Sequence, residues 1–123
     1  RSSMAPTLVF DKANGQLLLS AGSPGGALII HYTAKTLYGT LNWGLLPQPA
    51  IDLPNFASLN GPSLLEEKRF PPATVEALRA RGAEVREMTM TSGLQAIMRG
   101  TADGKPVLFG GADPRREGVV MGD

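Results

Sequence analysis

Residues Gly22-Ser23-Pro24-Gly25-Gly26 form a run of five small or turn-forming residues, and this run decides how the chain is expected to fold. Before it, Thr7–Phe10 and Gln16–Ala21 are two β-rich stretches joined across Asn14-Gly15, which is a strong signal for a β-hairpin. After it, apolar residues recur at helical spacing from Ala27 to Leu41. The sequence therefore predicts a strand, a glycine loop and an amphipathic helix that ends by Gly44.

The rest of the chain predicts shorter elements. Four prolines between Leu45 and Pro62 favour a stretch that is mainly loop. A helix is expected to begin at Pro71-Pro72 and to end at Gly82. Four further β-rich runs predict an edge strand, an isolated strand and a second hairpin, in the order Leu64–Arg69, Glu84–Thr91, Leu94–Met98 and Pro106–Phe109. The expected fold class is α+β, with about two helices covering a mostly antiparallel sheet.

Length and composition indicate one folded domain over residues 1–123. A hydrophobic share of 42% supports a core, and a charged share of 19% is too low for a disordered chain. A net charge of +1 argues against nucleic acid as a partner. No apolar run approaches the ~20 residues of a membrane span, so membrane insertion is not expected. With no cysteine and one histidine, neither a disulfide nor a metal or other cofactor is expected.

Gly25 and Gly26 are the candidate functional residues of the glycine loop. Glycine lets a ligand approach the backbone closely, and the first N–H groups of a helix lack intrahelical acceptors and lie at its positive end. The pattern is neither the dinucleotide fingerprint nor a phosphate loop, so an oxyanion hole fits better than a nucleotide site. On the loop alone, a purely structural turn is the more frequent explanation.

Other polar residues carry weaker signals. Ser2 and Ser3 precede a strand and could bind a ligand carboxylate, although serines at a chain start are usually solvent-exposed. His31 is expected to serve packing or the surface rather than catalysis. Glu66 and Glu67 point to opposite faces of a strand, which excludes an acid–base pair, and both are expected to be solvated. Asp113-Pro114-Arg115 is expected to be an anchoring turn with a local ion pair.

Several of these segments together resemble the γ-glutamyltransferase (γ-glutamyltranspeptidase) family. The resemblance rests on Arg1-Ser2-Ser3-Met4-Ala5-Pro6-Thr7 and on Gly22-Ser23-Pro24-Gly25-Gly26, which opens a helix with Ile29-Ile30. It is supported by Ser92-Gly93-Leu94-Gln95-Ala96-Ile97 and by Asp113-Pro114-Arg115. The stretch Leu53-Pro54-Asn55-Phe56, with Asn60-Gly61-Pro62 and Leu65-Glu66, is similar to bacterial, acylase-like members.

The resemblance implies a fold and a chemistry. Family members are N-terminal nucleophile hydrolases with an αββα fold, made as precursors that cut themselves so that a threonine begins the small subunit. Its hydroxyl attacks the γ-glutamyl amide and its own α-amine acts as the base. The resemblance assigns the oxyanion hole to Gly25 and Gly26 and the substrate α-carboxylate to Ser2 and Ser3. It also suggests a periplasmic or secreted protein.

One departure from the family pattern bears on activity. The nucleophilic threonine lies upstream of the Ser-Ser-Met motif in the family, whereas this chain begins at that motif with Arg1. The chain is therefore expected to be the C-terminal part of a small subunit, inactive alone, with apolar surface exposed where the rest of the small subunit and the large subunit would pack. A small-anion-binding module and a structural scaffold are the alternative functions.

Overall fold

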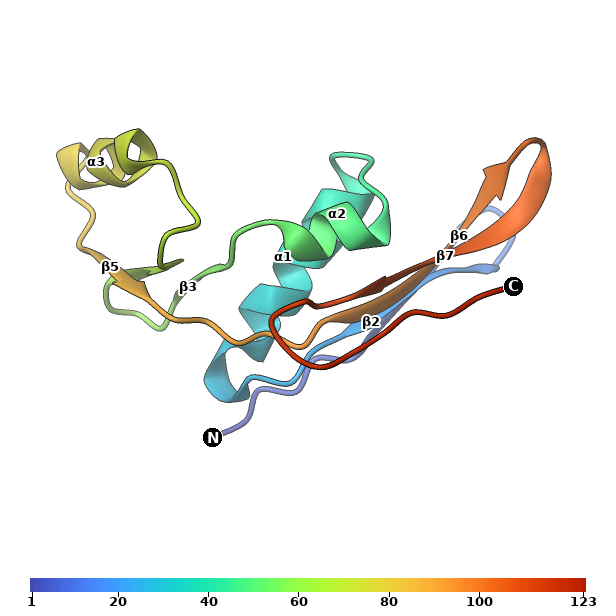
Figure 1. The fold of residues 1–123 in the computed structure, drawn as a ribbon, viewed down its shortest axis with the longest axis horizontal. Helices are drawn as coiled ribbons and strands as arrows, with labels where there is room; N and C mark the ends of the chain where they lie inside the picture. The colour runs from blue at the N-terminus through green and yellow to red at the C-terminus, as the bar shows by residue number, and fades with distance from the viewer. The chain divides into compact units, whose positions relative to one another are not determined.

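The computed structural model describes every residue from Arg1 to Asp123, and the chain divides into two compact units. The first unit comprises residues 1–53 and 92–123, and the second comprises residues 54–91. Figure 1 follows the chain through both units in sequence colours. The sequence predicts a single domain over residues 1–123, and the division into two compact units does not test that prediction.

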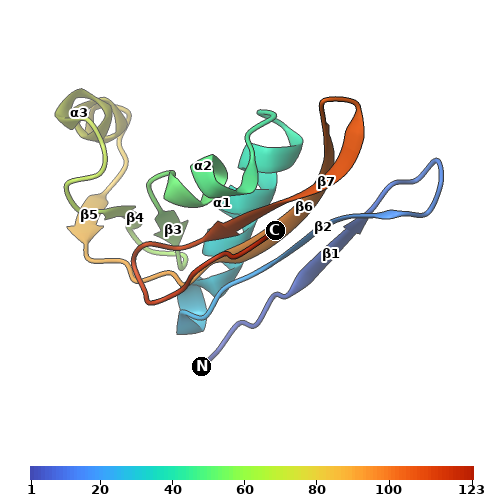
Figure 2. The same cartoon turned by 45° about the vertical axis from the view of Figure 1, so that its right-hand side comes forward.

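The first unit contains a four-stranded antiparallel sheet. Its strands are β1 (Thr7–Phe10), β2 (Leu17–Gly22), β6 (Gln95–Ala102) and β7 (Lys105–Ala112), in the spatial order β1-β2-β6-β7 (Figure 2). Both predicted hairpins are confirmed. The β1–β2 connection closes with Gly15 at φ 69°, and β6–β7 turns on Asp103 and Gly104 at φ 51° and 74°. Two successive positive φ values are typical of a type I′ hairpin turn, which matches strand twist.

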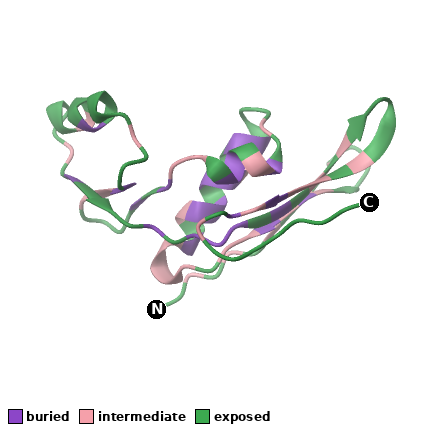
Figure 3. Ribbon diagram, viewed as in Figure 1, coloured by how far each residue is buried: buried purple, intermediate pink, exposed green.

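Two helices cover one face of this sheet. The short 3₁₀ turn η1 (Gly26–Leu28) leads into α1 (Ile29–Leu41), and α2 (Pro47–Asp52) follows. Helix α1 packs on β2, and α2 packs on β6 and β7. A Cβ at Gly39 would lie 3.1 Å from Ala50 Cβ, so the small residue lets α1 and α2 approach closely. Figure 3 shows the buried residues where these helices meet the sheet; those of the sheet include Leu19, Ala21 and Ala96.

The opposite face of the same sheet carries apolar side chains that remain exposed. Leu8, Ser20, Ile97 and Gly110 form one row across the four strands. Leu8 is 59% exposed and Ile97 is 54% exposed, while Leu108 on β7 reaches 69%. Full burial of a leucine or isoleucine side chain stabilises a protein by about 1.5–3 kcal/mol. The exposed side chains on this face do not contribute that stabilisation. The exposed apolar surface expected from the sequence is therefore present on the face without helices.

The second unit is a small three-stranded sheet with one helix. Its strands β3 (Phe56–Ser58), β4 (Ser63–Glu66) and β5 (Val85–Met88) lie in the order β3-β4-β5, and α3 (Pro72–Ala80) links β4 to its parallel neighbour β5. Gly82, at φ 89°, follows the end of α3 as predicted. The core of the unit consists of Leu65, Val75 and Val85, with Phe70, Leu78 and Ala83 packed around it.

Two expectations about regular structure are wrong. Residues 45–62 are not mainly loop, because they contain α2 and β3. Pro47 and Pro49 fall in the first turn of α2, where the backbone N–H groups need no intrahelical acceptor, so proline is tolerated there. The strand expected at the sheet edge is the central strand β4, because α3 returns β5 to its outer side. The α+β class and the mostly antiparallel pairing are confirmed, with three α-helices rather than about two.

No helix of the structure has the length and apolar character needed to cross a membrane.

Candidate active site

The glycine loop joins β2 to the start of the helical segment in a conformation that requires glycine. Gly25 has φ 141° and Gly26 has φ 61°, both in the region that residues with a side chain disfavour. A Cβ at Gly25 would lie 2.6 Å from Cε2 of the buried Tyr32, whereas the nearest atom to one at Gly26 is Arg1 O at 3.8 Å. Gly25 is therefore constrained by space and by φ, and Gly26 by φ alone.

The backbone amides of Gly25 and Gly26 have no acceptor within the chain. Neither N–H group takes part in a hydrogen bond, and the start of the 3₁₀ turn has no side-chain cap and no acidic residue. These are the amides that a helical start leaves unsatisfied, at the end where the helix dipole favours negative charge. Two adjacent backbone N–H groups are thus without acceptors within the chain, as the donors of an oxyanion hole must be before an anion binds.

The structure brings the Ser2-Ser3 segment next to this loop. Ser3 N donates to Gly26 O at 3.0 Å, and Ser3 Oγ lies 3.0 Å from Gly26 O and 3.1 Å from Ala27 O. Ser2 is exposed and forms no hydrogen bond within the chain. The two predicted site segments are therefore in contact, although the hydroxyl proton of Ser3 is directed at backbone carbonyls in this conformation.

Asp113 organises the segment that contacts the loop through a hydrogen bond from Gly93 N to Ser23 Oγ. Its carboxylate accepts hydrogen bonds from Ser92 Oγ, from Leu94 N at 3.1 Å, and from both the backbone N and Nη1 of Arg115 at 3.0 and 3.1 Å. Burial alone would raise the pKa of Asp113, but these hydrogen bonds outweigh it and hold the pKa below its ordinary value. The expected anchoring turn with an Asp113–Arg115 ion pair is confirmed.

Arg115 and Lys35 together bind the C-terminal end of α2. Arg115 Nη1 donates to Ile51 O at 3.2 Å and Nη2 donates to Leu53 O at 3.1 Å. Lys35 Nζ donates to the same two carbonyls, at 2.7 and 2.8 Å. Cations are stabilising where helical carbonyls lack intrahelical donors. These two side chains therefore fix α2 against α1 and against the turn that follows β7.

The remaining candidates from the sequence lie in different environments. His31 is half-buried on α1. Glu67 is exposed as expected, but the expectation that Glu66 is solvated is wrong, because Glu66 is buried and its Oε2 accepts from Asn55 N at 2.8 Å. The polar carboxyl group is tolerated at that buried position because the backbone supplies a donor. No group of three or more acidic or histidine side chains is arranged to hold a metal ion.

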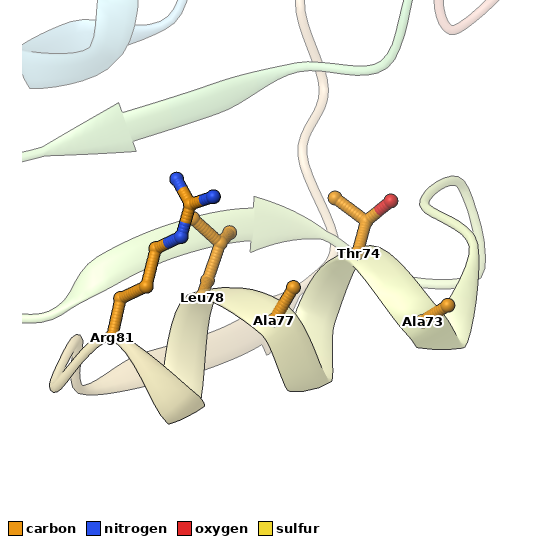
Figure 4. Close-up of a pocket in the computed structure, with 5 residues that line it drawn as sticks. All are labelled: Ala73, Thr74, Ala77, Leu78 and Arg81. Atoms are coloured by element: carbon orange, nitrogen blue, oxygen red, sulfur yellow. The ribbon is translucent and has the colours of Figure 1, made fainter.

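The second unit carries a shallow surface pocket of about 330 Å³ on α3. Figure 4 shows its lining, in which the guanidinium of Arg81 is the only charged group beside Ala73, Thr74, Ala77 and Leu78. A mostly aliphatic lining without a nucleophile, an acid or a base offers no chemistry. The glycine loop of the first unit is therefore the better candidate for an active site.

Comparison with known proteins places the fold of this chain in a structural class. The chain is similar to a γ-glutamyltranspeptidase from Helicobacter pylori, with a TM-score of 0.84 and 25% identity over 94% of this chain and 62% of that one. The match confirms the α+β architecture expected for an N-terminal nucleophile hydrolase.

Sequence comparison then identifies the family. The family model described as gamma-glutamyltranspeptidase matches residues 1–123, so the chain belongs to the γ-glutamyltranspeptidase family. It is 36% identical to a glutathione hydrolase proenzyme of Escherichia coli over 93% of this chain, and 31% identical to one from a Pseudomonas species over 98%. It spans 19% and 22% of the lengths of those relatives, about a fifth in each case.

Sequence reasoning missed the contacts of Ser23, Tyr32 and Lys35. Tyr32 lies under Gly25, and Lys35 binds carbonyls of α2. Ser23 Oγ accepts from Gly93 N, a residue 70 positions later in the chain. A serine directly before a proline and two glycines was the available signal for Ser23, whereas nothing local marks Lys35 as buried.

Proposed function

We propose that this chain supplies the oxyanion hole and part of the glutamate-binding site of an enzyme that transfers the γ-glutamyl group of glutathione-like compounds to water or to amino acids. The observation that carries the proposal is the pair of unpaired amides at Gly25 and Gly26, in contact with the Ser2-Ser3 segment. Membership in the γ-glutamyltranspeptidase family, and relatives named glutathione hydrolase proenzyme, support the choice of substrate class.

In the proposed reaction, a threonine hydroxyl attacks the carbonyl carbon of the γ-glutamyl amide. Its proton passes to the threonine's own α-amine and then to the leaving amine, so a γ-glutamyl ester forms as the C–N bond breaks. The carbonyl oxygen becomes negative while the carbon is tetrahedral, and the N–H groups of Gly25 and Gly26 donate to it. Removing one such donor costs on the order of 100- to 1,000-fold in turnover.

The proposed carboxylate site uses the segment beside the loop. The hydroxyl of Ser2 is exposed and available, so it can donate to the α-carboxylate of a bound glutamyl group. Ser3 can do so only by turning its hydroxyl away from Gly26 O and Ala27 O, while its backbone N–H continues to hold the loop. Ser2 is therefore the more direct ligand and Ser3 the one that joins the two halves of the site.

The nucleophilic threonine and the remaining substrate contacts are assigned to polypeptide outside this chain. Thr7 is within β1 and its nitrogen is part of a peptide bond, so it has no free amine to act as a base. We therefore propose that the chain works with the rest of the small subunit and with the large subunit of one precursor. Alone it is expected to release no product from a γ-glutamyl amide.

The test uses the complete protein that carries this chain, with a chromogenic γ-glutamyl anilide as substrate. A hydrogen bond to a charged group contributes about 1.5–3 kcal/mol. Ser2→Ala is therefore expected to raise KM by about tenfold or more, with kcat within about twofold, because the carboxylate does not change during the reaction. Thr101→Ala, at an exposed position near the β6–β7 turn, is the control and should leave both constants unchanged.

Three outcomes would contradict parts of the proposal. An unchanged KM in Ser2→Ala would remove Ser2 from the carboxylate site. Release of the aniline product by the 123-residue chain alone would show that the nucleophile is within it. Binding of glutamate by the complete protein without any turnover would favour the small-anion-binding module instead.

A further inference from the structure

The hydroxyl of Ser23 forms two hydrogen bonds at the entrance of the glycine loop. Ser23 Oγ donates to Pro24 O at 2.7 Å and accepts from Gly93 N at 3.0 Å. A hydroxyl can do both at once because it carries one proton and two lone pairs. Ser23 therefore connects the Pro24–Gly25 peptide group to the segment that begins β6.

The bond to Pro24 O fixes the direction of the Gly25 amide. Pro24 O and Gly25 N belong to one planar peptide group, and the chain contains no cis peptide bond. In a trans peptide the C=O and N–H bonds point in opposite directions, so holding the oxygen on one side turns the N–H to the other. Without that bond, the freedom of Gly25 in φ would allow the peptide group to rotate.

The neighbouring peptide group is held in the same way by the backbone. Gly25 O accepts from Leu28 N at 3.2 Å, which directs the Gly26 N–H away from that oxygen. This second bond belongs to the helical start and survives any side-chain substitution. The Gly25 amide is thus the one of the two whose direction depends on a side chain, and that side chain is Ser23.

The partner of Ser23 is rigidly placed. Gly93 is buried, and a Cβ there would lie 2.7 Å from Pro24 Cγ and 2.8 Å from Arg116 Cδ, so the two segments are in close contact. The residues on either side of it, Ser92 and Leu94, both donate to the carboxylate of the buried Asp113. Ser23 is therefore hydrogen-bonded to a segment that is itself held in place, rather than to a loop that could move with it.

From these contacts we infer that Ser23 is a positioning residue, which aims the Gly25 N–H at the oxyanion by holding Pro24 O against the Gly93 segment. The inference rests on the proposed function, because it gives Ser23 a role only if the loop binds a developing negative charge. Its expected effect is on the reaction step, since the carbonyl oxygen becomes fully charged only in the tetrahedral species.

The experiment compares Ser23→Ala and Ser23→Thr in the complete protein that carries this chain, with a γ-glutamyl anilide as substrate. Ser23→Ala is expected to lower kcat by about tenfold or more, less than deletion of a donor, because the amide remains but is free to rotate. KM should stay within about twofold. Ser23→Thr keeps the hydroxyl and should retain most of the wild-type kcat.

A matched control removes a comparable side-chain-to-backbone hydrogen bond elsewhere. Asn14 Oδ1 accepts from Gln16 N at 2.9 Å in the exposed β1–β2 turn, so Asn14→Ala should leave kcat unchanged. Wild-type kcat in Ser23→Ala would overturn the inference and leave the proposed function standing. A loss of kcat that Ser23→Thr does not restore, with a lowered melting temperature, would reduce Ser23 to a structural role. An inactive wild-type protein would overturn both.

Discussion

Replacement of Asp113 by asparagine tests the hydrogen-bond network that connects to the glycine loop through Gly93. The carboxylate accepts four hydrogen bonds, two on each oxygen, and its side chain is 1% exposed, while that of Arg115 is 7% exposed. In Asp113→Asn one oxygen becomes an NH₂ group, so two of the four donors face another donor. The hydroxyl of Ser92 can rotate to accept, but a backbone N–H cannot.

The magnitude follows from these losses. Hydrogen bonds to a charged group contribute about 1.5–3 kcal/mol each, and breaking a buried ion pair by removing one partner costs about 3–5 kcal/mol. Because the losses overlap, about 3 kcal/mol is expected for Asp113→Asn. Glu76→Gln is the matched control, since its ion pair with Arg79 has side chains 71% and 46% exposed and should contribute at most about 1 kcal/mol.

The assay is amide hydrogen exchange in the complete protein, followed on the peptide that contains Leu94. Leu94 N–H is bound to Asp113, and Asp113 N donates back to Leu94 O at 2.8 Å, so opening of this network exposes the amide directly. A change of about 3 kcal/mol corresponds to roughly a hundredfold loss of protection. Protection in Asp113→Asn equal to that in Glu76→Gln would refute the assignment of this network as a stabilising one.

The same amide reports a pH dependence with a definite sign. The pKa of Asp113 is lower in the folded state than in the unfolded chain. The ionised carboxylate therefore makes its full contribution to the free energy of unfolding at any pH above the pKa that Asp113 has in the unfolded chain. It is lost as the pH falls from there through the folded pKa, when the carboxylate takes up a proton. After correction for intrinsic exchange rates, wild-type protection should therefore fall in acid, while Asp113→Asn should be insensitive to pH over that range.

Three glycine-to-alanine substitutions test where the fold needs space and where it needs a positive φ. Gly25→Ala should lower the free energy of unfolding by about 2–6 kcal/mol, because strain at φ 141° adds to the clash with Tyr32. Gly26→Ala should lower it by about 1–2 kcal/mol, because only the positive φ is unfavourable there. Equal melting temperatures for the two variants would contradict this difference. Gly111→Ala should destabilise by about 1–3 kcal/mol or more, because its Cβ would lie 2.9 Å from backbone atoms of α2, and an unchanged melting temperature would show that α2 can shift to make room.

Local chemistry made part of the fold predictable from the sequence. Asn14-Gly15 marked the first hairpin because positive φ is inexpensive for these residues, and Pro71-Pro72 with Gly82 marked both ends of α3. The predictions that were wrong concerned elements whose stability depends on tertiary contacts. The short helix from Pro47 to Asp52 draws its stability from packing on β6 and β7 and from Lys35 and Arg115, none of which a local pattern of prolines reveals.

The candidate site likewise contains some features that local sequence predicts and others that depend on tertiary contacts. Gly25 and Gly26 could be singled out because the first amides of a helical start have no intrahelical acceptor, whatever the rest of the fold. Their contact with Ser3 follows from the pairing of β1 with β2, which sets Thr7 opposite Ala21 and returns the chain start to the loop. The role of Ser23 could not be predicted, because it depends on a partner 70 residues away.

The exposed apolar side chains on the sheet face without helices have a practical consequence for handling the polypeptide. Leu8, Ile97 and Leu108 would bind an environment-sensitive dye and drive concentration-dependent precipitation if the 123 residues were purified by themselves. If the chain works with the rest of the small subunit and with the large subunit, as proposed above, co-production with them should suppress both behaviours. Dye fluorescence during reconstitution would then serve as a direct titration of how much of that face has been covered.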